Sequence, residues 1–447
     1  MDIEYNDFTC SVDENKIYSL PSDITIIYRY GFWLYISPQN GSWIVLETQT
    51  QVDIFQHIFS KSTVGDTFKQ FEGYEEDVKY VLAQIEGKHL EHTFKSFDDD
   101  SFELRIYLTN NCNLRCKHCF MYADSPFENE LSTEEIITLI KKSAEAGATK
   151  LILTGGEVAL SKSFVPALII AKEYNMYTQV LSNGTAWTKA LFEEAKPYID
   201  EIQISIDGFN ENVNAEIRGK GAFNKALKTV EQFLNAGIFT SIIVTPLYGY
   251  AETYFNEYAE FGNALADKYE DKDFLIIFGN EIIDGRKVKS SKERNAAYAE
   301  TIEKLCEEIY PNNELTLFVK NHQYNTIFRN CGYGSLTVNS QGDVSFCGRV
   351  YEVKKYGNIR EDDFSEILHL RKTARKLSSI ETFVPCNQCN LRYVCGGGCR
   401  IANYNEITKI DDLYSVDTEK LAPRNCSTEY KENLYRLMIE SNDFLLW

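Results

Sequence analysis

The spacing of hydrophobic and polar residues changes twice along the chain, and these changes predict three segments. In the first, residues 1–95, β-branched and aromatic runs at 24–30, 33–36 and 42–46 indicate short strands separated by turn residues. Helical periodicity follows over three stretches, at 48–59, 66–71 and 75–85. A small sheet followed by three helices is typical of a winged-helix-like module.

The second segment, residues 102–320, alternates between strand and helix patterns. Its six candidate strands are Leu104–Leu108, Lys150–Thr154, Tyr177–Ser182, Glu201–Ile206, Thr240–Val244 and Phe274–Phe278. The first helix begins with a Ser-x-x-Glu capping box, Ser132 to Glu135. This alternation predicts an α/β fold with a parallel sheet, either doubly wound or curled into a barrel. Barrel enzymes carry their chemistry on the loops after the C-terminal ends of the strands.

The third segment, residues 325–447, loses this periodicity. Glycines, turn residues and seven cysteines take over, and a helical pattern returns only at Tyr430–Leu446. We expect this segment to fold around metal rather than around a large apolar core. The stretch Lys95–Ser101, with its run of aspartates, reads as a linker between the first two segments.

Composition narrows the possible functions. The 447 residues carry 66 acidic and 46 basic side chains, a net charge of −20, which disfavours binding to nucleic acid because that binding depends on Lys and Arg. No stretch resembles a membrane span, and the N-terminus lacks a secretory pattern, so we expect a cytoplasmic protein. Thiols stay reduced there, and the twelve cysteines need an explanation other than disulfides.

The first cysteine cluster follows the first predicted strand. Cys112, Cys116 and Cys119 have the spacing C-x3-C-x2-C, which allows three thiolates to bind three irons of a cubane cluster and leaves the fourth iron open. A closed zinc site would need a fourth protein ligand. His118 stands between two of the cysteines and is poorly placed to supply it.

Polar motifs stand at the ends of the next predicted strands. They contain Gly155, Gly156, Glu157, Ser182, Asn183, Ser205 and Asp207, and Arg218 follows shortly after the last of them. Bare glycine backbone allows close approach, and a carboxylate suits an ammonium group. Taken singly, Gly-Gly, Asn-Gly and Asp-Gly are ordinary turn chemistry. Their shared position at successive strand ends favours one common site.

Seven further cysteines follow the predicted barrel: Cys331, Cys347, Cys386, Cys389, Cys395, Cys399 and Cys426. The run from Cys386 to Cys399 has the spacing C-x2-C-x5-C-x3-C. Zinc remains an alternative, because C-x2-C pairs also form zinc knuckles.

These motifs together resemble the radical SAM (S-adenosylmethionine) superfamily, and the second cysteine field resembles its SPASM extension. The resemblance implies an α/β fold: a partial (β/α)6 TIM-like barrel with an N-terminal winged-helix-like domain and a C-terminal iron–sulfur domain. It also implies three [4Fe–4S] clusters and SAM. The strand-end residues from Gly155 to Arg218 named above would contact SAM: Glu157 its amino group and Arg218 its carboxylate.

The resemblance also implies ligand sets for two auxiliary clusters. Cys386, Cys389, Cys395 and Cys426 would hold the outer cluster completely, and Cys331, Cys347 and Cys399 the inner one. Some members have an extra cysteine shortly after the first, where this chain has residues 335–338, Ser-Leu-Thr-Val. The open iron would bind a substrate thiolate, or else water, another side chain, or a distant cysteine such as Cys306 or Cys10.

The first segment resembles the PqqD-like peptide-recognition element, on the run Tyr30–Tyr35, the Asn40-Gly41 turn and the strand after it. In that family a leader peptide adds a strand to the small sheet. A DNA-binding winged helix is the rival, disfavoured by the acidic chain and the lack of a basic stripe. A purely structural cap is a third possibility.

The combined resemblance implies a maturase similar to sactipeptide and ranthipeptide synthases. It would use a 5′-deoxyadenosyl radical to install a cross-link, foremost a cysteine thioether, in a ribosomally synthesised precursor peptide. The alternatives are a carbon–carbon or carbon–oxygen cross-link, a sulfatase-maturing activity, or a non-enzymatic iron–sulfur regulator. The expected partners are the precursor and an electron donor such as flavodoxin or ferredoxin, with neither nucleic acid nor membrane. No catalytic base is identified, since Gly348 and Arg349 follow Cys347.

Overall fold

The computed structural model describes residues 1–5, 8–91, 101–309, 313–322, 331–348, 356–400 and 426–445. Most of the predicted linker, Lys95–Ser101, lies outside these ranges. Every helix among the described residues is too short or too polar to span a lipid bilayer.

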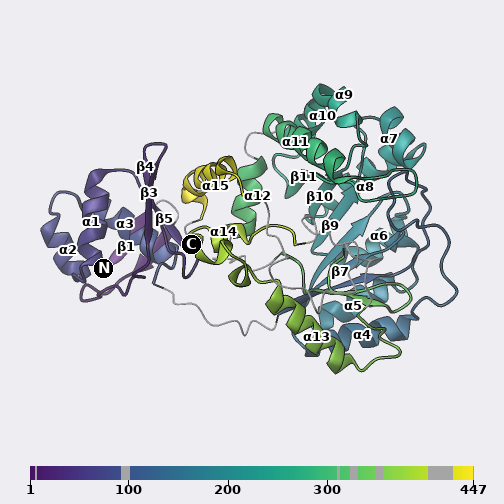
Figure 1. Ribbon diagram of the computed structural model, residues 1–447, viewed down its shortest axis with the longest axis horizontal. Coiled ribbons are helices and arrows are strands. Elements are labelled where there is room, and N and C mark those ends of the chain that lie inside the picture. The colour runs from purple at the N-terminus through teal and green to yellow at the C-terminus, as the bar shows by residue number, and fades with distance from the viewer. Residues whose placement is uncertain are drawn as a thin grey trace.

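A mixed sheet of eight strands forms the centre of the larger part of the molecule (Figure 1). Six consecutive strands are parallel: β6 (Phe102–Tyr107), β7 (Ala148–Thr154), β8 (Tyr177–Ser182), β9 (Glu201–Ser205), β10 (Phe239–Val244) and β11 (Phe274–Phe278). They lie in chain order across the sheet, as the strand–helix alternation predicts. Their carboxyl ends therefore meet at one edge, where the candidate motifs stand.

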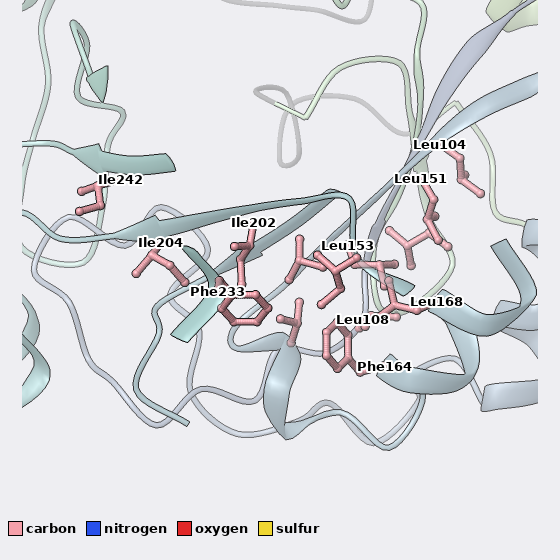
Figure 2. Close-up of a cluster of buried hydrophobic side chains, with 14 of the residues drawn as sticks. Leu104, Leu108, Leu151, Leu153, Phe164, Leu168, Ile202, Ile204, Phe233 and Ile242 are labelled. Atoms are coloured by element: carbon pink, nitrogen blue, oxygen red, sulfur yellow. The ribbon is translucent and has the colours of Figure 1, made fainter. Parts of the chain in front are cut away.

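Helices connect and flank these strands (Figure 1). They are α4 (Thr133–Glu145), α5 (Phe164–Glu173), α6 (Lys189–Ala195), α7 (Glu211–Arg218), α8 (Ala222–Asn235), α9 (Tyr250–Thr253), α10 (Phe255–Lys268), α11 (Lys292–Glu308) and α12 (Asn313–His322). The predicted capping box is present at α4, where Ser132 and Glu135 bond reciprocally. Figure 2 shows the core between sheet and helices, where Leu153 and Ile202 lie near Phe164 and Phe233.

The C-terminal part contributes to the same sheet. β12 (Leu336–Val338) pairs parallel to β6, and β13 (Val344–Ser345) pairs antiparallel to β12. Leu336, Val338 and Val344 are fully or almost fully buried in the main core. The expectation that this segment avoids a large apolar core is therefore wrong for these strands. Beyond them lie α13 (Phe364–Leu377), α14 (Arg392–Cys395) and α15 (Thr428–Glu440).

The N-terminal part has the strand and helix order that its pattern predicts. β3 (Thr25–Arg29), β4 (Phe32–Ile36) and β5 (Trp43–Leu46) form an antiparallel sheet, followed by α1 (Gln49–Phe59), α2 (Val64–Gln70) and α3 (Glu75–Gly87). An additional pair, β1 (Asp2–Tyr5) with β2 (Phe8–Ser11), was not predicted.

The two faces of this small sheet have different partners. Tyr35, Ile44 and Leu46 pack in one apolar cluster with α1 and α3. The opposite face packs in another cluster with α14 and α15 of the C-terminal part. Figure 1 shows the small sheet between the N-terminal helices and α15. The N-terminal sheet is thus sandwiched between its own helices and the cysteine-rich part.

Candidate functional site

The first cysteine cluster lies on the loop directly after β6. The Cys112 backbone N–H donates to the Asp124 carbonyl at 2.9 Å, and the Cys119 N–H donates to the Cys116 carbonyl at 3.3 Å. Burial raises the pKa of the Cys112 thiol and raises that of Cys116 to about 11, with smaller effects from the neighbouring thiols. Buried thiols grouped in this way are suited to a metal cluster, because burial disfavours the free thiolates and a bound metal would stabilise them.

Two side chains from later strand ends reach the thiols of this loop. Asn183 Nδ2 lies 3.8 Å from Cys112 Sγ, and Arg218 Nη1 lies 3.9 Å from Cys116 Sγ. Both groups are N–H donors, and hydrogen bonds to cluster sulfurs change the reduction potential of a cluster. The structure therefore brings the predicted residues Asn183 and Arg218 to the cysteines themselves.

The two glycines after β7 allow their backbone to lie against the backbone of residues 109–111. Gly155 has φ +146°, and a Cβ there would lie 2.7 Å from the Thr109 carbonyl oxygen. A Cβ on Gly156 would clash with the Asn111 carbonyl, and the Gly156 N–H donates to the Thr109 carbonyl at 2.7 Å. These glycines pack the end of β7 against the segment that leads into the cysteine loop.

Glu157 is buried at the same strand end and connects β7 to β8. Its carboxylate accepts hydrogen bonds from Ser182 Oγ at 2.7 Å, from the Asn183 N–H at 2.7 Å and from the Ala159 N–H at 3.2 Å. Burial raises the pKa of Glu157, and these hydrogen bonds oppose the rise. Ser182 Oγ also accepts from Trp187 Nε1 at 3.0 Å. Glu157 and Ser182 are thus fixed by each other.

Asp207 is the centre of a buried charged group that also contains Arg218 and His118, and His118 belongs to the cysteine loop. Asp207 Oδ2 lies 2.5 Å from Arg218 Nε and 3.2 Å from His118 Nε2, and Asp207 Oδ1 accepts the Thr245 N–H at 3.0 Å. Burial alone would lower the pKa of Arg218, but its charge interaction and hydrogen bond with Asp207, together with the charges of the Cys116 and Cys112 thiols, raise that pKa. Burial lowers the pKa of His118. Ser205, also predicted as a contact, is the last residue of β9 and pairs with Ile243 of β10.

A further segment supports the cysteine loop, although sequence reasoning gave it no role. Gly285, after β11, approaches so closely that a Cβ would lie 2.5 Å from the His118 carbonyl oxygen. The Arg286 N–H donates to the Cys119 carbonyl at 3.2 Å, and the Lys287 N–H donates to the Lys117 carbonyl at 2.7 Å. In the sequence, the pair Gly285-Arg286 after the sixth predicted strand is the feature that could have indicated this contact.

Four cysteines of the second field converge on one pocket. Cys386, Cys389, Cys395 and Cys426 line it, together with Arg392, Tyr430 and Lys431. Burial raises the pKa of Cys386, and the Cys395 and Cys389 thiols raise it further. This donor set is the one predicted for the outer cluster, and four soft sulfur ligands around one pocket fit an iron–sulfur cluster.

The three cysteines predicted for the inner cluster are less closely defined. Cys331 and Cys347 flank the same end of the β12–β13 hairpin, since the Gly334 N–H donates to the Phe346 carbonyl at 2.9 Å. Cys399 follows three glycines with φ values of 62°, 76° and 71°. Cys306 packs against the main core and Cys10 against the N-terminal core. Among the described residues, no three His, Cys, Asp or Glu side chains are close enough together to hold a single metal ion, so the cysteines around the outer pocket are spaced too widely for a mononuclear site.

Comparisons with known proteins identify two domain families in this chain. A family model of the radical SAM superfamily matches residues 106–262, and a model of the SPASM iron–sulfur cluster-binding domain matches residues 330–390. The sporulation killing factor maturation protein SkfB of Bacillus subtilis is 28% identical over 59% of this chain and 63% of its own length. An AdoMet-dependent heme synthase of Oleidesulfovibrio alaskensis is 26% identical over 69% of this chain and 86% of its own length.

Solved structures show the same fold. The crystal structure of Streptococcus suis SuiB bound to S-adenosylmethionine superposes with a TM-score of 0.50 at 17% identity, covering 87% of this chain and 97% of SuiB. The matched residues 106–262 include the first cysteine loop and the strand-end motifs, and residues 330–390 include the first four cysteines of the second field. Residues 106–262 therefore form a radical SAM domain, and residues 330–390 form a SPASM iron–sulfur cluster-binding domain.

Proposed function

We propose that the protein is a peptide maturase that forms a cysteine thioether cross-link in a ribosomally synthesised precursor. When bound, SAM and a cluster held by Cys112, Cys116 and Cys119 would supply the radical that removes a hydrogen from the peptide. The name of SkfB, a maturation protein of a killing factor, supports a peptide substrate. The observation that carries the proposal is an exposed edge strand on the N-terminal sheet.

That edge strand is β3, which among the described residues pairs with β4 alone. Ile26 and Tyr28, at alternate positions of β3, and Tyr30, in the turn after it, are each more than half exposed. Alternate residues of a strand face the same side, so Ile26 and Tyr28 form an apolar row beside the strand's edge. An edge with a neighbouring apolar row suits an extended peptide that adds a strand, and we assign the leader of the precursor to it.

The residues of the barrel hold and orient the reacting groups in this proposal. The backbones of Gly156 and Glu157 bond to the segment that leads into the cysteine loop. The Asp207–Arg218 pair lies next to the same loop, where Arg218 reaches Cys116. Cys331, Cys347 and Cys399 would leave one corner of the inner cluster for the thiolate of a peptide cysteine, because iron prefers soft sulfur ligands. The four thiols of the outer pocket would hold the other auxiliary cluster, which would take part in removing the surplus electron. A flavodoxin or ferredoxin would supply the reducing electron.

The test is co-expression with candidate precursor peptides, taken from any short open reading frames found near the gene, followed by mass spectrometry of the peptide. A thioether is expected to remove two hydrogens per cross-link and to protect one cysteine from alkylation. A loss of two hydrogens with every cysteine still alkylatable would contradict the thioether and indicate a carbon–carbon or carbon–oxygen link.

A second measurement separates an enzyme from an iron–sulfur regulator. The reduced protein incubated with SAM should release 5′-deoxyadenosine. Replacing Cys112, Cys116 and Cys119 together with Ala should abolish this release and leave the auxiliary iron in place. If release persists in the triple variant, these cysteines do not hold the SAM-cleaving cluster.

A further inference from the structure

The outer cluster pocket and the N-terminal sheet share one apolar cluster of side chains. Leu34, Ile36, Trp43 and Val45 of β4 and β5 pack there with residues of α14 and α15, and Cys389 and Cys395 lie against its margin. Leu434 of α15 belongs to this cluster and also lines the pocket. The position of the N-terminal sheet and the shape of the pocket are therefore not independent.

Helix α15 makes the direct contacts in both directions. Near its start, the Tyr430 hydroxyl lies 3.6 Å from Cys395 Sγ. Further along, the Met438 carbonyl accepts a hydrogen bond from Trp43 Nε1 at 3.1 Å. On the exposed side, Glu432 pairs with Arg29 of the edge strand at 3.0 Å. One helix thus contacts a predicted cluster ligand at one end and the small sheet along its length.

We propose that Tyr430 is a positioning residue for the outer auxiliary cluster and that the N-terminal sheet holds it in place through α15. Once Cys395 binds iron as a thiolate, the hydroxyl is the donor and the sulfur the acceptor. A hydrogen bond to a cluster sulfur favours the more reduced state, whose sulfurs carry more negative charge. The contact therefore raises the reduction potential of the outer cluster.

The first test replaces Tyr430 with Phe, which removes the hydroxyl and keeps the ring. Redox titration of the reconstituted holoprotein, followed by electron paramagnetic resonance, should show one cluster couple moved to a more negative potential. A Cys386→Ala variant identifies that couple as the outer one by its loss. Tyr435→Phe is the matched control, because Tyr435 lies on the same helix and packs toward the sheet. An outer potential equal to that of the wild type in Tyr430→Phe overturns the proposal.

The second test changes the sheet and leaves the pocket residues untouched. Trp43→Phe removes the hydrogen bond to Met438, so α15 is held less firmly and the outer potential should move in the same direction as in Tyr430→Phe, by a smaller amount. Tyr35→Phe is the control, because Tyr35 lies in the adjacent strand of the same sheet but faces α1 and α3. Equal potentials in the Trp43 and Tyr35 variants contradict the coupling.

The inference rests on the outer cluster that the cysteine set implies, and it does not depend on which cross-link forms. The readout is a potential measured without peptide. A precursor that remains unmodified in co-expression would contradict the proposed function and leave this result unchanged. An unshifted potential would contradict the inference and leave the cross-linking result unchanged.

Discussion

At the scale of single residues, Arg218 differs most between the expected and the observed contact. The resemblance assigns its guanidinium to a cofactor carboxylate, whereas the structure pairs it with buried Asp207 at 2.5 Å. The sequence carries no signal for this pair, because Asp207 precedes α7 and Arg218 is the last residue of that helix, so the two meet only when β9 and α7 pack. The pairing with SAM remains a prediction, and the pairing with Asp207 gives Arg218 a structural role as well.

Arg218→Met should destabilise the barrel by about 3–5 kcal/mol, because it leaves the carboxylate of Asp207 buried without its cationic partner. Urea unfolding of the cluster-free protein measures the loss. Adding Asp207→Asn to the same chain should recover much of it, since the uncompensated charge is then gone. Lys220→Met is the control, because Lys220 is exposed two residues further along and should leave the unfolding midpoint unchanged. Equal midpoints for Arg218→Met and Lys220→Met would contradict the structural role.

At the scale of elements, the parallel strands were predictable from two kinds of residue pattern. β11, Phe-Leu-Ile-Ile-Phe, reads as a continuous apolar run, which is typical of a strand covered on both faces, whereas buried residues alternate along β8 and β9. The pairing of β12 with β6 could not be predicted. β12 has only three residues, and its partner lies more than 200 positions earlier in the chain.

An ion pair at the start of α4 predicts how the stability of the protein depends on pH. Arg360, from the C-terminal part, donates to both carboxylate oxygens of Glu135, at 2.6 and 2.8 Å. This guanidinium is the largest cause that lowers the pKa of Glu135 to about 2 from the ordinary 4.5. Because the folded protein holds the charged form, the stabilisation is complete above about pH 4.5 and is lost as the pH falls toward 2.

Arg360→Gln should therefore lower the midpoint of thermal unfolding at pH 7. The difference between the midpoints of the variant and the wild type should shrink as the pH falls from 4.5 to 2. Differential scanning calorimetry across this range is the measurement. Lys376→Gln, which removes an exposed charge from the same part of the chain, should show no such closing gap. A gap that stays constant with pH would show that Glu135 does not carry the effect.

At the scale of the whole molecule, both faces of the N-terminal sheet are covered, and the edge of β3 is exposed. The sheet is covered by α1 and α3 on one side and by α15 on the other, so neither face is open over its whole area. The remaining surface for a partner is the edge of β3 with its apolar row. The sequence indicated the strands of this part, but it could not indicate that the sheet packs on the cysteine-rich part, because that contact joins opposite ends of the chain.

Tyr28→Asp should weaken binding of the leader peptide by tenfold or more, since a charge replaces an apolar contact beside the edge. Fluorescence anisotropy of a labelled leader measures the affinity. Tyr74→Asp is a matched control in the same part of the chain, because Tyr74 is as exposed as Tyr28, 53% against 54%, but lies at the start of α3. If both variants lose affinity equally, the leader does not bind along β3.

The attachment of β12 to β6 has a consequence for dissecting the protein. A fragment that stops before residue 331 would keep the six parallel strands but would expose the backbone donors and acceptors of β6 along one side. Unpaired strand borders invite other chains to align with them. Such a fragment should self-associate, so we expect that the radical SAM domain cannot be obtained as a clean monomer without the residues that form β12.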